Sequence, residues 1–238
     1  MNLALIIAGG SGHRMGQDIP KQFLLVNEKP IIIYTLENFQ KNDRIDEISV
    51  VCIDGWHETL WQYAKQYNIT KLKYVIQGGA TAQESIRNGV NRLYAEYQGD
   101  HCVVIHDGIR PLVDETVLND VIDTYESFGN GVSALPYNEQ IFIKKDAQST
   151  NQYIPRETLM RVSTPQAYHL EKLYTSYEKA FKNRIGTTDS SYVNTMLVEL
   201  GETLYFAKGS DKNIKLTSKE DLDIFTAYIS AKNENRIK

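Results

Sequence analysis

Apolar runs in this chain alternate with segments in which apolar residues recur every three or four positions. The runs are typical of buried strands, and the spaced positions are typical of helices that cover a sheet. The expected strands are residues 3–7, 48–53, 73–76, 101–105, 131–135 and 203–208. The expected helices are residues 31–39, 56–67, 85–97, 116–128, 170–181, 190–200 and 217–232. This alternation predicts an α/β fold with a Rossmann-like, mainly parallel sheet and helices on both faces.

The alternation breaks at about residues 137–159. Two short strand-like pieces, residues 140–144 and 152–154, flank a polar turn. They predict a β-hairpin arm that protrudes from a single domain of residues 1–238. An isolated hairpin is only marginally stable in water, so the arm should pack on something. An arm folded back on its own domain is also compatible with the sequence.

Composition excludes several classes of protein. The 238 residues, 42% of them hydrophobic, suffice for one large core. No apolar run is long enough to span a bilayer, no charged-then-apolar leader precedes the first run, and the formal charge of −4 gives no general nucleic-acid surface. Cys52 and Cys102 lie within apolar runs, so we expect buried reduced thiols. A cytoplasmic enzyme that binds neither membranes nor nucleic acid fits these features.

A glycine-rich loop follows the first apolar run. It reads Ala8-Gly9-Gly10-Ser11-Gly12-His13-Arg14-Met15-Gly16 and continues to Pro20-Lys21-Gln22. Its glycines let main-chain N–H groups approach an anion closely, and Arg14 and Lys21 add two positive charges. Together these features indicate a polyphosphate site, the alternative being a tight surface turn with stray basic residues.

Two common phosphate motifs do not fit this loop. A Walker A loop requires Gly-Lys followed by Ser or Thr, and the segment has no Gly-Lys pair. The dinucleotide pattern G-x-G-x-x-G fits Gly10 and Gly12 but has Met15 at its third glycine. Pro20 disfavours a helix that runs directly from the turn. The loop should therefore wrap around phosphates without beginning a helix pointed at them.

The loop, together with Pro20-Lys21-Gln22-Phe23, resembles the signature of CTP-dependent cytidylyltransferases. These include the methylerythritol-phosphate and ribitol-5-phosphate cytidylyltransferases. The resemblance implies cytidylyl transfer from CTP to an alditol phosphate, release of pyrophosphate, a requirement for Mg²⁺ or another divalent cation, and a homodimer clasped by the arm. Such transfer depends on fixed cations that stabilise the charge growing at the α-phosphorus. An acceptor phosphate is already ionised, so no general base is required.

Three cations are the expected catalytic groups. By resemblance, Arg14 and Lys21 contact the triphosphate, and their positions on a glycine loop support this independently. Lys215 matches a family Asn-Ile-Lys segment whose lysine reaches the α-phosphate, whereas spacing alone would leave it a solvated loop lysine. The loop residues expected to bind CTP are Ala8, Gly9, Gly10 and Gly12.

A second glycine turn, Gly78-Gly79, precedes Ser85. By resemblance, this turn and the serine bind the cytosine and ribose of CTP. An ordinary turn followed by a helix N-cap also fits the same residues. The family often has an acidic residue and an arginine where this chain has Ala80 and Ala82, which weakens the assignment of base recognition.

The segment from His106 to Pro111 matches the family pattern His-Asp-x-x-Arg-Pro. A carboxylate beside an anion site requires a cation or a sugar hydroxyl. By resemblance, Asp107 binds hydroxyls of the acceptor and lies near the metal, and Arg110 holds the acceptor. His106 is expected to pack in the core, because no second histidine stands at ligand spacing.

Arg156, Thr188 and Gln140 complete the predicted acceptor site. By resemblance, Arg156 on the arm binds the acceptor phosphate, in dimers across the subunit boundary, and its planar fork suits phosphate oxygens. Thr188 belongs to a Thr-Asp segment that contacts the same phosphate, begins a helix, or does both. Gln140 replaces a family threonine that touches the acceptor, so the pocket should be altered. Thr164-Pro165-Gln166 is interpreted as a structural turn.

The resulting hypothesis is a cytidylyltransferase for ribitol 5-phosphate or a related small polyol phosphate, serving cell-surface polymer synthesis. Trp56 and residues 29–37 resemble the ribitol-phosphate side of the family. Methylerythritol 4-phosphate of isoprenoid synthesis is the alternative acceptor, and a sugar-1-phosphate nucleotidylyltransferase is more distant. A nucleotide-binding module without turnover is the non-enzymatic alternative, although binding alone would not need Arg14, Lys21 and Lys215 together.

Overall fold

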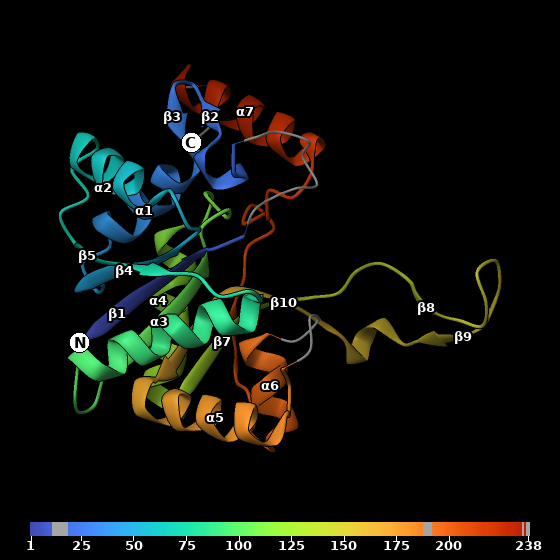
Figure 1. Cartoon of the computed structure of the whole chain (residues 1–238). Coiled ribbons are helices and arrows are strands. Elements are labelled where there is room, and N and C mark those ends of the chain that lie inside the picture. The colour runs from blue at the N-terminus through green and yellow to red at the C-terminus, as the bar shows by residue number, and fades with distance from the viewer. Residues whose placement is uncertain (11–18, 188–191, 235, 237–238) are drawn as a thin grey trace.

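The computed structural model describes residues 1–10, 19–187, 192–234 and 236 (Figure 1). Within these residues, seven strands form one sheet in the order β11-β7-β10-β6-β1-β4-β5. Their bounds are β1 (Asn2–Ala8), β4 (Glu47–Cys52), β5 (Leu72–Gln77), β6 (Cys102–Asp107), β7 (Asn130–Pro136), β10 (Met160–His169) and β11 (Phe206–Lys208). Strand β10 pairs antiparallel with β6 and β7, and the other described pairs in this sheet are parallel. The predicted mainly parallel sheet is confirmed.

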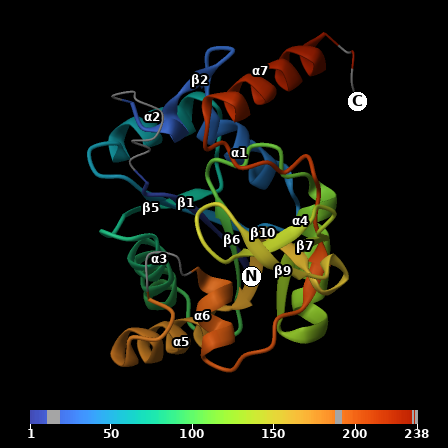
Figure 2. The same ribbon diagram turned by 90° about the vertical axis from the view of Figure 1, so that its right-hand side faces the viewer.

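Helices cover both faces of this sheet, as the apolar runs require. Helices α1 (Ile31–Lys41), α2 (His57–Gln66) and α4 (Glu115–Phe128) pack on one face, and α3 (Ala82–Glu96), α5 (Leu170–Asn183) and α6 (Val193–Glu199) on the other. Figure 2 shows α1 and α2 on one side of the strands and α5 and α6 on the opposite side. In β1, Ala4 and Ile6 face the first group of helices and Leu3 and Leu5 the second.

A smaller apolar cluster lies beyond the sheet. It joins helix α7 (Lys219–Asn233) to the short hairpin β2 (Leu25–Val26) and β3 (Lys29–Pro30), which precedes α1. Phe225 and Ile229 of α7 pack there with Leu216, Ile109 and residues of the hairpin. This cluster holds the segment before α7 against the residues that follow β6.

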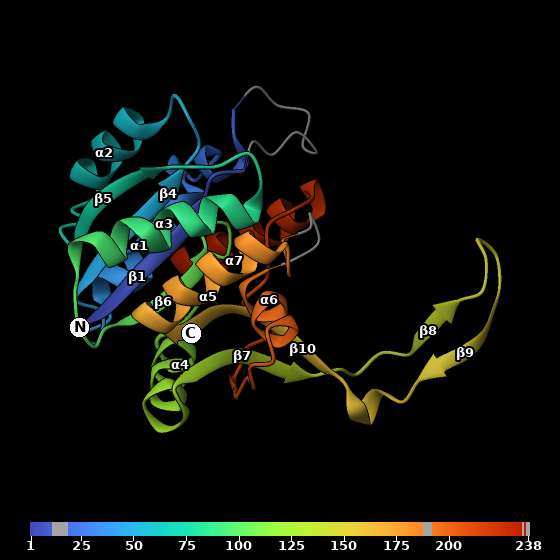
Figure 3. The ribbon, with the colours of Figure 1, turned by 60° about the horizontal axis from the view of Figure 1, so that its bottom comes forward.

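The hairpin arm extends far from the sheet (Figure 3). It consists of β8 (Ile141–Lys144) paired antiparallel with β9 (Thr150–Ile154), and the short helix η3 (Arg156–Thr158) follows. Phe142 and Tyr153 are more than half exposed on it. The predicted protruding hairpin is confirmed.

Four predicted details are corrected by the structure. The expected strand at 203–208 is shortened to β11, and a long strand, β10, stands where a turn and loop were expected. Helix α3 begins at Ala82, with Thr81 and not Ser85 as its N-cap. Helix α7 is capped by Ser218 with Asp221, one residue beyond the Thr217-Ser218-Lys219-Glu220 capping pattern at which the sequence predicts the helix over 217–232 to begin.

Both cysteines are buried and unbridged, as predicted. Burial raises the pKa of each thiol to about 12, so neither is a reactive thiolate. Among the described residues, the helices are too short or too polar to cross a bilayer.

Candidate active site

A cleft of about 680 Å³ opens beyond the carboxyl ends of β1 and β6, the edge at which parallel sheets bind ligands. From the first loop and the second glycine turn its lining includes the predicted residues Ala8, Gly9, Gly10, Lys21, Gly79 and Ser85, while the predicted Gly78 is not among the described lining residues. From the segments after β6 and before α7 it includes Asp107, Arg110 and Lys215. The predicted residues Gly12, Arg14 and Thr188 lie outside the described residues. The cleft therefore unites parts of the chain that are two hundred residues apart.

Gln22 fixes the described part of the first loop. Its side chain is 1% exposed, and Nε2 donates to the Ala8 carbonyl at 2.7 Å and to the Gly10 carbonyl at 3.1 Å. Lys21, which precedes it, begins a short 3-10 helix after the extended Pro20 and lines the cleft. Sequence reasoning assigned Gln22 no role, because an amide beside a lysine in a polar loop carries no pattern of burial.

The second glycine turn packs against the first loop. The N–H of Gly78 donates to the Cys52 carbonyl at 3.0 Å, and a Cβ on Gly9 would lie 3.1 Å from the Ser85 hydroxyl oxygen. A Cβ on Gly79 would meet the Cβ of Glu84 at 2.4 Å, closer than atoms can approach. Glycine is therefore required at position 79 by contact with α3.

Ser85 holds this glycine turn and does not cap the helix. Its Oγ accepts from the Gly79 N–H at 2.9 Å. The cap is a reciprocal pair in which the Glu84 N–H donates to Thr81 Oγ1 at 3.1 Å and the Thr81 N–H donates to Glu84 Oε2 at 3.3 Å. Glu84 Oε2 also accepts from the Ala80 N–H at 2.8 Å. The acidic residue beside Ala80 in this chain is therefore Glu84, in the first turn of α3.

Asp107 is the electrostatic centre of the opposite wall. Its Oδ2 accepts from Arg110 Nε at 2.9 Å, and its Oδ1 lies 3.2 Å from Lys215 Nζ. Burial by itself would raise the pKa of this carboxyl, but the charges of Lys215 and Arg110 outweigh it and lower the pKa to about 2. Asp107 is therefore ionised at neutral pH. The cations that this strand-end carboxylate was expected to need are Arg110 and Lys215.

Lys215 is held in place and is not a solvated loop lysine. Arg110 donates from NH1 to the Asn213 carbonyl at 2.7 Å, and the Leu216 N–H donates to the Ile109 carbonyl at 2.9 Å. Lys215 Nζ also lies 5.7 Å from the centre of the Tyr192 ring, within range of a cation–π contact. The lysine thus faces the cleft with its loop anchored on both sides.

Thr164 is a site residue that the sequence did not reveal. Its hydroxyl accepts from the Asp107 N–H at 3.1 Å and donates to Asp107 Oδ2 at 3.3 Å, while its carbonyl accepts from Asn213 Nδ2 at 2.7 Å. The Thr164–Pro165 peptide is cis, and β10 shifts register between Val162 and Gln166. This bulge aims Thr164 at Asp107, so the predicted structural turn is part of the cleft wall.

His106 lies directly behind Asp107 and is fully buried, as its predicted packing role requires. Its ring is 5.2 Å from that of Phe39, and Nε2 donates to the Arg110 carbonyl at 3.1 Å. Burial lowers its pKa to about 4. Its Nδ1 has no hydrogen-bond partner among the described residues. A neutral imidazole therefore fills this position.

The cleft wall can supply few protein ligands to a metal. Asp107 is the one carboxylate among the described lining residues, and they hold no cluster of three or more potential ligands. Mg²⁺ commonly takes one or two carboxylates and completes its shell with substrate phosphates and water. The residues thus fit a metal carried by a triphosphate better than one held by the protein alone.

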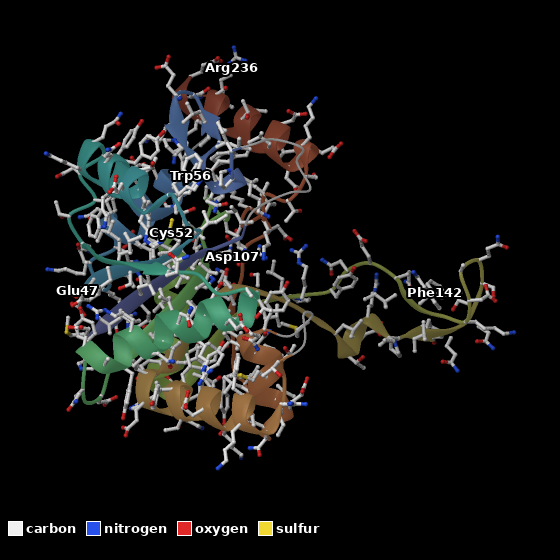
Figure 4. The ribbon with its side chains drawn as sticks, viewed as in Figure 1. Glu47, Cys52, Trp56, Asp107, Phe142 and Arg236 are labelled. Atoms are coloured by element: carbon white, nitrogen blue, oxygen red, sulfur yellow. The ribbon has the colours of Figure 1, made fainter. Side chains whose placement is uncertain are left out.

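Two predicted acceptor residues stay apart from the cleft of their own chain. Arg156 and Gln140 belong to the arm and do not line the cleft as described, and Arg156 donates from NH1 to the Asn138 carbonyl at 3.1 Å. Figure 4 shows Phe142 far out on the arm and Asp107 in the body of the molecule. In this conformation neither arm residue reaches the cleft of its own chain.

Comparison with known proteins gives concordant results. The model of the family 2-C-methyl-D-erythritol 4-phosphate cytidylyltransferase matches residues 2–231. A protein of Lacticaseibacillus paracasei named ribitol-5-phosphate cytidylyltransferase is 57% identical over 98% of this chain and 99% of its own length. A Clostridioides difficile protein named 2-C-methyl-D-erythritol 4-phosphate cytidylyltransferase is 36% identical over 100% of this chain and 97% of its own. The crystal structure of 4-diphosphocytidyl-2C-methyl-D-erythritol synthase from Anaerococcus prevotii, 23% identical, shares the fold with a TM-score of 0.81 over 96% of this chain and 98% of that one.

Proposed function

The chain belongs to the 2-C-methyl-D-erythritol 4-phosphate cytidylyltransferase family, and we propose that it transfers the cytidylyl group of CTP to ribitol 5-phosphate. The products are CDP-ribitol and pyrophosphate. The observation that carries the choice of acceptor is the 57% identity, over almost the whole chain, to a relative named for that acceptor. The relative named for methylerythritol 4-phosphate reaches 36%. A cytoplasmic location, where CTP is made, is part of the proposal.

The reaction is an in-line displacement at phosphorus. An oxygen of the ribitol phosphate attacks the α-phosphorus of CTP, and the bond to the pyrophosphate oxygen breaks. That phosphate is largely ionised at neutral pH, so the cleft needs no general base. Charge grows on the α-phosphoryl oxygens and on the leaving group, and fixed positive groups near them lower the barrier.

Lys21 and Lys215, which both line the cleft, supply those positive groups. Arg14, expected on the first loop, would add a third. Bound Mg²⁺ would neutralise charge on the triphosphate, with Asp107 as the protein group able to hold it. Asp107 also accepts hydrogen bonds from polyol hydroxyls in this scheme, because its carboxylate is ionised and faces the cleft. Gly79 and Ser85, which line the cleft, border the space for cytidine, and Gly78 supports them from behind through its hydrogen bond to the Cys52 carbonyl.

The arm makes the proposed enzyme a homodimer. Phe142 and Tyr153 expose 56% and 63% of their surface, and an isolated hairpin is marginal in water, which supports burial of the arm against a second copy. In such a dimer Arg156 and Gln140 reach the partner's cleft, where the guanidinium binds the acceptor phosphate and the amide shapes the pocket. Their distance from the cleft of their own chain supports this arrangement.

The test is release of pyrophosphate from CTP and Mg²⁺ with a panel of acceptors. We expect kcat/KM for ribitol 5-phosphate to exceed that for 2-C-methyl-D-erythritol 4-phosphate by at least about 100-fold. Preference for methylerythritol 4-phosphate would overturn the assigned acceptor while leaving the cytidylyltransferase reaction in place. CTP binding without release of pyrophosphate for any polyol or sugar phosphate would instead indicate a nucleotide-binding module.

A further inference from the structure

Two buried hydrogen bonds of one glutamine join α3 to α5 and to the segment that precedes α6. Gln83 lies in the first turn of α3, close after the second glycine turn, and its side chain is 1% exposed. Its Nε2 donates to the Gly186 carbonyl at 2.8 Å, and its Oε1 accepts from the Tyr177 hydroxyl at 2.9 Å. Because a carbonyl can only accept, the amide nitrogen must face Gly186, which fixes the orientation of the whole amide.

Gly186, which Gln83 holds, packs against α6. Its φ is +58°, and a Cβ there would lie 2.6 Å from the Cα of Met196, so its backbone packs directly on the helix. The residues at the start of α6, Val193 and Asn194, line the cleft, as does Tyr192 just before them. The position of this wall therefore depends on where Gly186 is held.

The same wall touches the charged centre of the cleft. The Tyr192 ring lies 5.7 Å from Lys215 Nζ, and Lys215 pairs with Asp107. Gln83 thus stands between the nucleotide-side turn and the wall beside Asp107. An apolar side chain at position 83 would leave the buried Gly186 carbonyl without its hydrogen-bond donor. Because an unpaired buried polar group costs free energy, we expect the segment around Gly186 to shift until the carbonyl finds another partner.

We infer that Gln83 is a positioning residue that sets the α6 wall of the cleft relative to the CTP-binding turn. Its amide touches neither substrate and acts through Gly186. Resting on the proposed function, which places the polyol hydroxyls at Asp107, this role predicts a larger effect on that substrate than on CTP. A residue that only stabilised the fold would not discriminate between the two substrates.

The test is the variant Gln83→Met, which keeps the length of the side chain and removes both hydrogen bonds. We expect the KM for ribitol 5-phosphate to rise about tenfold, the change that one buried hydrogen bond of ordinary strength produces, while the KM for CTP stays within about twofold. Tyr177→Phe keeps the bond to Gly186 and should change the KM for ribitol 5-phosphate by less than about threefold. Val121→Ala, a core truncation in α4 on the opposite face, controls for lost stability and should change neither KM.

Hydrogen exchange supplies a readout that needs no turnover. In Gln83→Met the amides of α6 should exchange faster than in the unmodified protein, and in Val121→Ala they should not, relative to the rest of the chain. The positioning role would be overturned if Gln83→Met changed the KM values for ribitol 5-phosphate and CTP equally. It would also be overturned if the amides of α6 exchanged in Gln83→Met as they do in Val121→Ala. If the unmodified protein accepts no polyol phosphate, the proposed function fails, and exchange at α6 still decides the role of Gln83. If Gln83→Met does not fold, Gln83→Asn, whose amide stops short of Gly186, takes its place.

Discussion

Acid should destabilise this protein through one buried imidazole, that of His106. The ring is fully buried, donates from Nε2 to the Arg110 carbonyl, and has no partner for Nδ1 among the described residues. A second proton on Nδ1 would therefore sit in the core without an acceptor. Burial is the main cause that lowers the pKa to about 4. The hydrogen bond to the Arg110 carbonyl and the charge of Asp107 oppose this shift, and the charges of Arg110 and Lys215 add to it.

The direction and size of the effect follow from linkage. Unfolded histidine titrates near its ordinary pKa of 6.5, and folded His106 at about 4, so between these values the unfolded state binds a proton that the folded state does not. Stability is therefore unaffected well above pH 6.5 and falls as the pH drops toward 4. Between pH 7 and pH 5 the loss amounts to about 2 kcal/mol, at about 1.4 kcal/mol for each pH unit below 6.5.

The measurement is urea unfolding at pH 7 and pH 5 for three proteins. The variant His106→Gln keeps a donor for the Arg110 carbonyl but cannot be charged, so its loss between the two pH values should be smaller by about 2 kcal/mol. Phe39→Leu disturbs the aromatic contact and keeps the imidazole, so it should lose stability at both pH values and keep the full pH dependence. Identical pH dependence in His106→Gln and the unmodified protein would refute the reasoning.

Three further outcomes follow from the site and the arm. Lys21→Ala should abolish turnover with a change in Tm of no more than about 2 °C, because a loop lysine adds little packing, and normal pyrophosphate release would remove its assigned role. Lys215→Met should slow turnover by at least about 100-fold and raise the pKa of the Asp107 carboxyl, read by NMR titration; an unchanged pKa would contradict the pairing. The double variant Phe142→Glu with Tyr153→Glu should sediment as a monomer that still binds CTP, and a persistent dimer would refute burial of the arm.

The alternation of apolar runs and spaced apolar positions predicted most of this fold, because burial on both faces leaves a strong local pattern. Strand β10 was not predicted, because Pro165 interrupts its apolar run and a bulge breaks the alternation of buried and exposed residues. The start of α7 was misplaced by one residue because Thr217-Ser218-Lys219-Glu220-Asp221 contains two overlapping capping boxes. Only the folded chain shows that Asp221 Oδ2 accepts from the N–H groups of Thr217 and Ser218.

In the candidate site, too, contacts between residues close in sequence were easier to predict than contacts between distant ones. Gly79 could be predicted because its neighbour in space, Glu84, is also its neighbour in sequence. The ion pair of Asp107 with Lys215 spans 108 positions, and the hydrogen bonds of Asp107 with Thr164 span 57. No local pattern encodes such pairs. The chemistry of Asp107 and Lys215 could be proposed from sequence but their pairing could not, and Thr164 was not recognised as a site residue.

The pairing of Asp107 with Lys215 also constrains how the cleft can respond to its substrates. A carboxylate with a pKa of about 2 is ionised at neutral pH, so protonation does not release the lysine there. Lys215 can turn to a phosphate only when another group competes for it or for the carboxylate, such as phosphate oxygens at Nζ or polyol hydroxyls at Oδ1. Binding of phosphate oxygens at Lys215 and binding of polyol hydroxyls at Asp107 favour each other, because each weakens the same ion pair. In the proposed reaction, therefore, an empty cleft keeps its lysine neutralised, and a cleft filled on both sides leaves the lysine to face the phosphate charge.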